Sequence, residues 1–186
     1  MKVVFAGNPN VGKTSLFNRV TGSFEHVGNY PGVTVQRKAK TTKIGEEEYE
    51  FVDLPGLYSL NARSAEEVLA ADELRSKNAD VVVVVCEVNN LCRNLYLATQ
   101  IFDLGIKTVL AVNMMDELPR GRKFDAEKLA ERLGIAVVPV SAKYRKGSEN
   151  LIKEIKRARV PHLRKSKVYA DVKREAAERY KLIDSV

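Results

Sequence analysis

The stretch from Gly7 to Thr14, "GNPNVGKT", has residue types and a spacing suited to holding a phosphate. It fits G-x-x-x-x-G-K-[ST] at every fixed position, between an apolar strand-like run (2–7) and a helical pattern from Lys13 to about Thr21. The glycines allow a tight loop whose N–H groups point inward, and the helix adds its positive end. Lys13 can reach the β- and γ-phosphates, and the Thr14 hydroxyl can ligate Mg²⁺. The other residues predicted to line this phosphate loop are Asn8, Pro9, Asn10, Val11, Gly12 and Ser15.

Two further segments have the chemistry to recognise a base. In "NMMD" (113–116), Asp116 can accept hydrogen bonds from guanine N1–H and N2–H₂, whereas adenine would leave this carboxylate unpaired. Asn113 can bond the purine N7 edge or tie its loop to the phosphate loop. In "SAK" (141–143), the Ala142 N–H is suited to guanine O6, and Lys143 can cover the ring. The predicted base-binding residues are Asn113, Met114, Asp116, Ser141, Ala142 and Lys143.

The stretch "DLPGLY" (53–58) is suited to sensing a metal ion and a terminal phosphate. Asp53 follows an apolar strand-like run, and its carboxylate is expected to lie just behind the groups that ligate Mg²⁺ directly. Gly56 can offer its N–H to a γ-phosphate, and Thr34 can close over Mg²⁺ through its hydroxyl, unless it is an ordinary loop threonine. Such contacts convert the presence of one phosphate into the order of a loop. Leu57 can neither donate nor accept a hydrogen bond, so its side chain cannot orient water.

The elements that position these motifs are predicted by alternating apolar and helical patterns. The run "VVVVVCEV" (81–88) is typical of a buried parallel strand, and "VQRKAKTTKI" with "EYEFVDL" indicates an antiparallel hairpin. Gly22 is predicted to end the first helix, and "DAEKLAERLG" is predicted to be a helix with Asp125 as N-cap and Gly134 as terminator. Residues 23–34 show no periodicity and are predicted to form a loop. Six strands and about five helices indicate a three-layer, doubly wound α/β fold, with a mostly parallel six-stranded sheet and one antiparallel edge strand. Ligands of such folds bind beyond the carboxyl ends of the strands, where all these motifs fall.

Composition indicates a soluble globular protein. The chain has 186 residues, which is the size of one ordinary domain, and 45% of them are hydrophobic. No apolar run reaches the roughly 18 residues needed to span a bilayer, and the N-terminal apolar run is too short for a signal peptide, so we expect a cytoplasmic location. Cys86 and Cys92 lack a zinc-site spacing and are expected to be reduced. Most of the net charge of +7 comes from residues 151–186, with 11 Lys/Arg and 5 Asp/Glu, which is typical of a solvated helix face or of contact with anionic lipid or RNA.

Taken together, "GNPNVGKT", Thr34, "DLPG", "NMMD" and "SAK" resemble the P-loop GTPases of the translation-factor class. The usual guanine motif there is N-K-x-D, and Met114 replaces its lysine. From residue 1 to about 158, "GNPNVGKTSLFNRVTG", "HVGNYPGVTV", "DLPGLYSL" and "RNLYLATQ" resemble the N-terminal G domain of the FeoB ferrous-iron transporters. Glu87 stands where that family usually has an aspartate.

The resemblance implies that residues 1–158 are a GTPase domain of a protein in the cell membrane, using GTP/GDP and Mg²⁺. Residues 159–186 would then be a basic linker and the start of a truncated helical regulatory segment. The implied partners are the helical and transmembrane domains of the same full-length chain. Homo-oligomers are left open and nucleic acid is not expected. Two alternatives are a ribosome- or RNA-associated regulatory GTPase, which the basic tail favours mildly, and a module that switches without appreciable hydrolysis.

Slow hydrolysis is expected because Leu57 occupies the position of the water-orienting glutamine of Ras-like enzymes. Asn10 could instead ligate a monovalent cation beside the β–γ bridge, and resembling families with this asparagine use potassium. Its alternative role is a hydrogen bond within the loop. Water could also be held by backbone groups or by Glu66 or Glu67, although "SAEE" (64–67) favours a helix capping box for these two. The predicted catalytic residues are Asn10, Lys13, Thr34 and Gly56. The predicted metal-site residues are Thr14, Thr34, Asp53 and Asn10.

Overall fold

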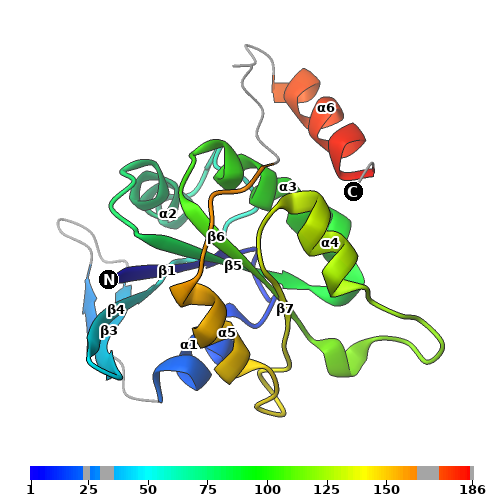
Figure 1. Ribbon diagram of the computed structural model, residues 1–186. Helices are drawn as coiled ribbons and strands as arrows, with labels where there is room; N and C mark the ends of the chain where they lie inside the picture. The colour runs from blue at the N-terminus through cyan, green and yellow to red at the C-terminus, as the bar shows by residue number, and fades with distance from the viewer. Residues whose placement is uncertain (23–25, 30–35, 163–171, 185–186) are drawn as a thin grey trace.

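The computed structural model describes residues 1–22, 26–29, 36–162 and 172–184, and its middle layer is a seven-stranded sheet (Figure 1). The strand order is β2-β3-β4-β1-β5-β6-β7. The strands are β1 (Lys2–Gly7), β2 (His26–Asn29), β3 (Gln36–Ile44), β4 (Glu47–Asp53), β5 (Val81–Glu87), β6 (Lys107–Asn113) and β7 (Val137–Pro139).

Helices cover both faces of this sheet (Figure 1). One face carries α1 (Lys13–Thr21) and α5 (Ser148–Lys156). The other carries α2 (Ala65–Arg75), α3 (Leu91–Asp103) and α4 (Ala126–Leu133), and α6 (Val172–Asp184) packs against α3. Two short 3₁₀ turns, η1 (Val88–Asn90) and η2 (Met115–Glu117), follow β5 and β6.

The central strands explain why the sheet is buried on both sides. β1 pairs in parallel with both β4 and β5, so the chain winds outward in two directions from it. Along β5, Val82 and Val84 pack toward α2 and α3, while Val83 and Val85 pack toward α1 and α5. All four side chains are fully buried. An uninterrupted apolar run is what such a strand requires, and the doubly wound α/β fold predicted from the sequence is confirmed.

One sequence-based assignment is wrong. The segment 23–34 was predicted to be a loop, but His26–Asn29 forms β2, which pairs antiparallel with β3 from His26↔Ala39 to Asn29↔Gln36. The sheet therefore has seven strands rather than six, and β2 rather than β3 is its antiparallel edge. A four-residue edge strand is held mainly by backbone hydrogen bonds to its neighbour, so its side chains carry little periodic signal.

The predicted helix ends are confirmed. Gly22 closes α1 with φ 72°, and Gly134 closes α4 with φ 70°, both in the left-handed region that favours glycine. Asp125 caps α4 by accepting the Lys128 N–H at 2.9 Å. At the start of α2, Ser64 and Glu67 form a capping box, as "SAEE" indicated.

Beyond α5 the chain stays attached to the body of the fold. The Thr108 N–H donates to the Arg159 carbonyl at 2.8 Å, and the His162 N–H donates to the Leu133 carbonyl at 3.0 Å. The His162 ring fills the space beside Gly134, where a Cβ atom would lie 2.3 Å from the ring Cγ. Any side chain at Gly134 would therefore displace this histidine.

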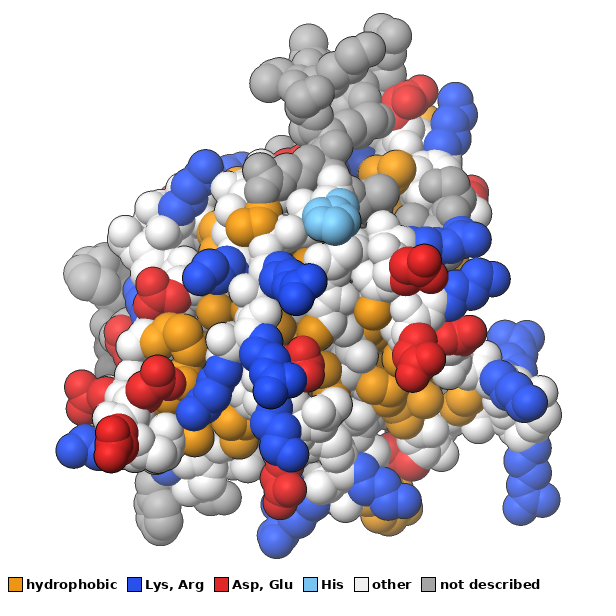
Figure 2. All heavy atoms as spheres, viewed as in Figure 1, with side chains coloured by type: hydrophobic (Ala, Val, Ile, Leu, Met, Phe, Trp, Pro, Cys, Tyr) orange, Lys and Arg blue, Asp and Glu red, His pale blue; other side chains and the backbone are white. Residues whose placement is uncertain are grey.

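The surface over α5 is basic but mixed. Figure 2 shows Lys and Arg side chains over this region with acidic ones among them. Lys153, Lys156 and Arg157 are exposed, and Lys156 Nζ lies 3.8 Å from the Glu47 carboxylate. Both cysteines are free, Cys86 being buried and Cys92 exposed. Among the described helices, none has the length and apolar character to cross a membrane.

Candidate functional site

Two adjoining cavities lie beyond the carboxyl ends of the strands, where the predicted motifs meet. A cavity of about 530 Å³, here called the base cavity, is lined by residues of α1, "NMMD" and "SAK". A cavity of about 630 Å³, the phosphate cavity, is lined by the phosphate loop together with Gly56 and Glu66. Gly12, Ser15 and Met114 line both. Both volumes fall within the range of ligand pockets, and together they offer a charged end and a base-sized end.

The phosphate loop takes its shape from two residues in the left-handed region. Gly12 has φ 76° and Asn10 has φ 67°. Asparagine is one of the few residues that adopt this conformation readily. Gly12 is constrained further, because a Cβ atom there would lie 2.4 Å from Asn113 Nδ2. The loop thus depends on glycine where it meets the base motif.

Lys13, Thr14 and Asp53 form a charged group at the end of β4 and the start of α1. Lys13 is 7% exposed, and its ammonium pairs with Asp53 Oδ1. The Thr14 hydroxyl donates to Asp53 Oδ2 at 2.6 Å. Hydroxyl and carboxylate oxygens are the ligands that Mg²⁺ prefers, so Thr14 with Asp53 beside it fits a magnesium site facing the phosphate cavity.

The segment after Asp53 runs directly beside the phosphate loop. The Leu54 N–H donates to the Phe5 carbonyl and the Leu57 N–H to the Gly7 carbonyl, each at 3.1 Å. A Cβ atom at Gly56 would lie 3.0 Å from both Cα and N of Pro9. The close approach of these two backbones therefore favours glycine at position 56, since any larger residue would push Pro9 away.

Leu57 is a core residue. Its side chain is fully buried in the apolar cluster formed with α2 and α3, and it is not among the described residues that line either cavity. The prediction that its side chain does not orient water agrees with this placement. Its role is to anchor the segment that carries Gly56.

Asn113 connects the base motif with two other loops. Its Nδ2 donates to the Val11 carbonyl at 2.9 Å, and its Oδ1 accepts the Ala142 N–H at 3.0 Å. Of the two roles considered for Asn113, the structure shows the tie to the phosphate loop. The Ala142 N–H, which the sequence analysis assigned to guanine O6, donates here to Asn113 Oδ1. Ala142 still lines the base cavity.

Asp116 lies in the base cavity with its charge stabilised. The Ser141 hydroxyl donates to Asp116 Oδ1 at 2.5 Å. This hydrogen bond, with smaller contributions from the nearby ammonium groups of Lys143 and Lys146, lowers the pKa of Asp116 below its ordinary value. The carboxylate stays ionised at neutral pH and can accept hydrogen bonds.

The remaining candidate residues differ in where the structure places them. Thr34 lies outside the described residues. Glu67 is occupied by the capping box, whereas Glu66 lines the phosphate cavity. Asn8 lines the phosphate cavity and is 3% exposed, and its buried Oδ1 has no hydrogen-bond partner among the described residues.

Sequence reasoning missed Arg19. Its Nε donates to the Ala142 carbonyl at 3.0 Å, and the residue lines the base cavity together with Asn18. The only available signal was the position of Arg19 on the helix that the phosphate loop starts. A loop partner 123 positions away cannot be seen from helical spacing.

Comparisons with known proteins agree with this geometry. The family of Ferrous iron transport protein B matches residues 1–155. The Fe(2+) transporter FeoB of Legionella pneumophila is 45% identical over 141 residues, which is 73% of this chain and 19% of that protein. An Fe(2+) transport protein A/Fe(2+) transporter FeoB fusion protein of Porphyromonas gingivalis is 43% identical over 153 residues, or 81% of this chain and 18% of that protein. The chain thus spans about a fifth of these relatives.

Solved structures of related domains share the fold. The GDP-bound FeoB G domain of S. thermophilus, in a mutant form, is 42% identical with a TM-score of 0.79, over 86% of this chain and 61% of that one. The cytosolic domain of L. pneumophila FeoB is 38% identical with a TM-score of 0.84, over 91% and 68%. The G domain of T. maritima FeoB is 40% identical with a TM-score of 0.79, over 84% and 97%. The chain therefore belongs to the FeoB family and contains its N-terminal G domain.

Proposed function

We propose that residues 1–158 bind guanine nucleotide and hydrolyse GTP slowly, as the cytoplasmic switch domain of a ferrous-iron transporter. The observation that carries the proposal is the junction of the two cavities. Lys13, Thr14 and Asp53 supply the charged end, and Asn113 joins it to the cavity that holds Asp116. The GDP found in the S. thermophilus relative supports the same ligand class. The RNA-associated alternative is not favoured, since the match to the ferrous-iron transport family covers residues 1–155.

Base choice is assigned to Asp116. Its ionised carboxylate accepts from guanine N1–H and N2–H₂, and Ser141 holds the acceptor in place. Met114 lines both cavities and covers the junction with a thioether chain. Adenine lacks the 2-amino group and would leave a carboxylate oxygen unpaired, which is costly.

The phosphates are assigned to the loop from Asn8 to Ser15. Lys13 carries the positive charge that β- and γ-phosphate oxygens need, and Thr14 would hold Mg²⁺ with Asp53 behind it. Bound Mg²⁺ would neutralise phosphate charge during bond cleavage. Gly56 would offer its N–H to the γ-phosphate, and Thr34 would close over Mg²⁺ through its hydroxyl. Only GTP presents this third phosphate, so these two contacts distinguish GTP from GDP.

Water activation is assigned to groups other than Leu57. Asn10 lines the phosphate cavity and carries an amide oxygen that fits potassium, which would neutralise charge at the β–γ bridge. Glu66 lines the same cavity and is the alternative, acting as an acceptor for the attacking water. The remaining partners, namely the helical and transmembrane domains and the Fe²⁺ that they would move, follow from the family.

Two measurements test this function. Asp116→Asn should weaken GTP binding and favour xanthosine triphosphate, since the amide donates where the carboxylate accepts. Unchanged GTP affinity would contradict the base assignment. GTP turnover should be faster in potassium than in sodium buffer of equal ionic strength, and Asn10→Ala should remove the difference. Equal rates in both salts would remove potassium from the mechanism and favour Glu66.

A further inference from the structure

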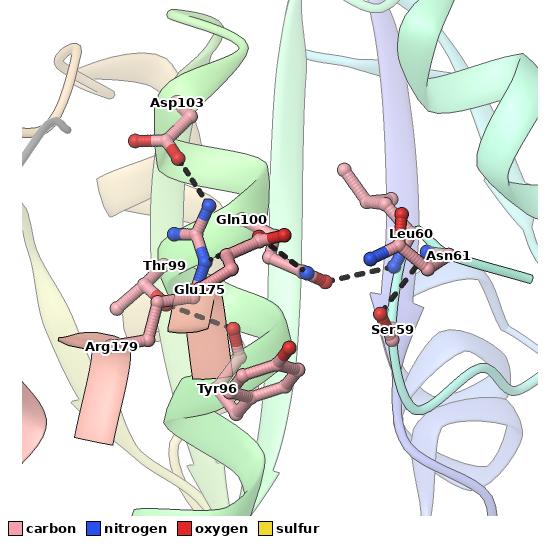
Figure 3. Close-up of polar contacts among 9 residues, drawn as sticks. All are labelled: Ser59, Leu60, Asn61, Tyr96, Thr99, Gln100, Asp103, Glu175 and Arg179. Carbon is pink, nitrogen blue, oxygen red and sulfur yellow. Dashed lines mark hydrogen bonds and ion pairs between the residues drawn. The ribbon is translucent and has the colours of Figure 1, made fainter. Parts of the chain in front are cut away.

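Helix α6 is seated on α3 by buried charge, as Figure 3 shows, and also by a pair of stacked rings. Arg179 is 5% exposed; its Nη2 lies 2.5 Å from Asp103 Oδ2, and its Nε lies 2.8 Å from Glu175 Oε1. The Tyr180 and Tyr96 rings stack with centroids 5.5 Å apart. A buried guanidinium is costly unless its partners are well placed, so this contact favours one docking geometry.

Gln100 of α3 lies between this helix and the loop that follows Gly56. It is 4% exposed and uses both ends of its amide (Figure 3). Its Oε1 accepts the Leu60 N–H at 2.8 Å, and its Nε2 donates to Glu175 Oε1 at 3.1 Å. The Leu60 carbonyl accepts from Arg75 Nη2 at 2.6 Å. Side chains therefore hold both backbone groups of Leu60.

The segment from Leu54 to Leu60 carries Gly56 and is here called the phosphate-sensing loop. The hydrogen bond between Gln100 and Leu60 fixes its far end. At the near end, the Leu57 N–H donates to the Gly7 carbonyl, and Gly56 packs against Pro9. Only Tyr58 and Ser59 lie between the two anchors at Leu57 and Leu60. Tyr58 is itself covered by the Arg93 guanidinium of α3, 4.7 Å from the ring centroid. A shift of Leu60 thus has a short path to Gly56.

The orientation of the Gln100 amide depends on α6. A carboxylate such as Glu175 accepts only, so it selects the NH₂ end of the amide and turns the oxygen toward Leu60. Without Glu175, only the Leu60 N–H still selects the oxygen end, and the buried NH₂ end loses the acceptor that holds Gln100 in place. The hydrogen bonds from Arg179 and Gln100 outweigh the effect of burial and lower the pKa of Glu175, so it is ionised at neutral pH.

We propose that Gln100 is a positioning residue that couples the docking of α6 to the placement of Gly56, and hence to the discrimination of GTP from GDP. This inference rests on the proposed function, because it assigns the γ-phosphate to Gly56. Docked α6 holds Leu60 in the position seen here. When α6 is not docked, Leu60 is released, and the affinity of the site for GTP falls more than its affinity for GDP.

The test measures the affinities of a non-hydrolysable GTP analogue and of GDP on the 186-residue chain. Gln100→Glu keeps an acceptor for Leu60 but sets a second carboxylate against Glu175. It should lower the ratio of GTP-analogue to GDP affinity by about five- to tenfold, the effect of one or two ordinary hydrogen bonds. Adding Glu175→Gln should restore much of the ratio, because the carboxylate placed at position 100 then faces an amide that can donate to it, although Arg179 loses one of its two carboxylate partners and keeps Asp103. Lys181→Gln, on the exposed side of α6, is the control.

The outcomes separate the two proposals. If the unaltered chain binds neither nucleotide, the proposed function fails. If it binds both but Gln100→Glu leaves the ratio unchanged, or weakens both nucleotides equally, the coupling through Gln100 is refuted. Failure of the double variant to restore the ratio refutes the role of Glu175. If Gln100→Glu does not fold, Glu175→Ala makes the same test by removing the partner, and the ratio should again fall.

Discussion

Leu57→Gln places a water-orienting side chain at the position where Ras-like enzymes carry one, yet we expect it to destabilise the fold rather than accelerate hydrolysis. Leu57 is fully buried among apolar side chains of α2 and α3. Exchanging it for glutamine loses about 2 kcal/mol of apolar burial. Burying an amide without partners costs about 1–3 kcal/mol more. The expected loss is about 3–5 kcal/mol.

The assay is thermal unfolding followed by circular dichroism, with single-turnover GTP hydrolysis measured on the same samples. For a chain of this length, the expected loss lowers the Tm by about 6–20 °C. Leu57→Met is the matched control, since it keeps an apolar side chain of similar volume and should cost less than about 1.5 kcal/mol. A Leu57→Gln variant that melts like the unaltered protein and hydrolyses GTP faster would refute the assignment of Leu57 to the core.

Three further predictions concern single contacts. Gly56→Ala should lower the affinity for a GTP analogue by about tenfold or more, because the new Cβ atom would lie 3.0 Å from Pro9. Fluorescence titration measures this affinity, and an unchanged value would mean that Gly56 lies elsewhere in the bound state. Ser141→Ala should raise the pKa of Asp116 toward its ordinary 3.8, as read from carboxyl NMR shifts; no rise would mean that Ser141 is not its main stabiliser. Acidification should loosen α6, because the stabilisation from the lowered pKa of Glu175 is present above its ordinary 4.5 and is lost as pH falls through the lowered value. The near-UV signal of the stacked tyrosines reports this, and an unchanged signal at pH 3 would contradict it.

The fold could be predicted to a large extent because its strands and helix ends carry local signals. The valine run of β5 and the cap residues Gly22, Asp125 and Gly134 marked elements that the structure confirms. β2 could not be predicted, since its order comes from the backbone of β3 rather than from its own pattern. A residue whose role depends on contacts within its own segment, such as a helix cap, can be identified from the sequence alone.

The site was predictable in residue types and less so in partners. The motifs placed Lys13 and Asp116 at the two cavities and Asp53 beside Lys13, but they did not predict the hydrogen bond from the Ala142 N–H to Asn113, because it depends on the distance between two loops. Gln100 was overlooked for the same reason. It lies on a helix that is covered on two sides, by the sheet and by α6, and its partner Glu175 is 75 positions away.

The two bonds of the Asn113 amide have a kinetic consequence for nucleotide exchange. Val11 belongs to the loop assigned to the phosphates and Ala142 to the loop assigned to the base, and one side chain holds both. Opening either loop breaks one of the two hydrogen bonds that hold the Asn113 amide and so loosens its hold on the other loop, and the two are therefore expected to open together. Release of the base and of the phosphates should then follow a single exponential, without a half-released intermediate.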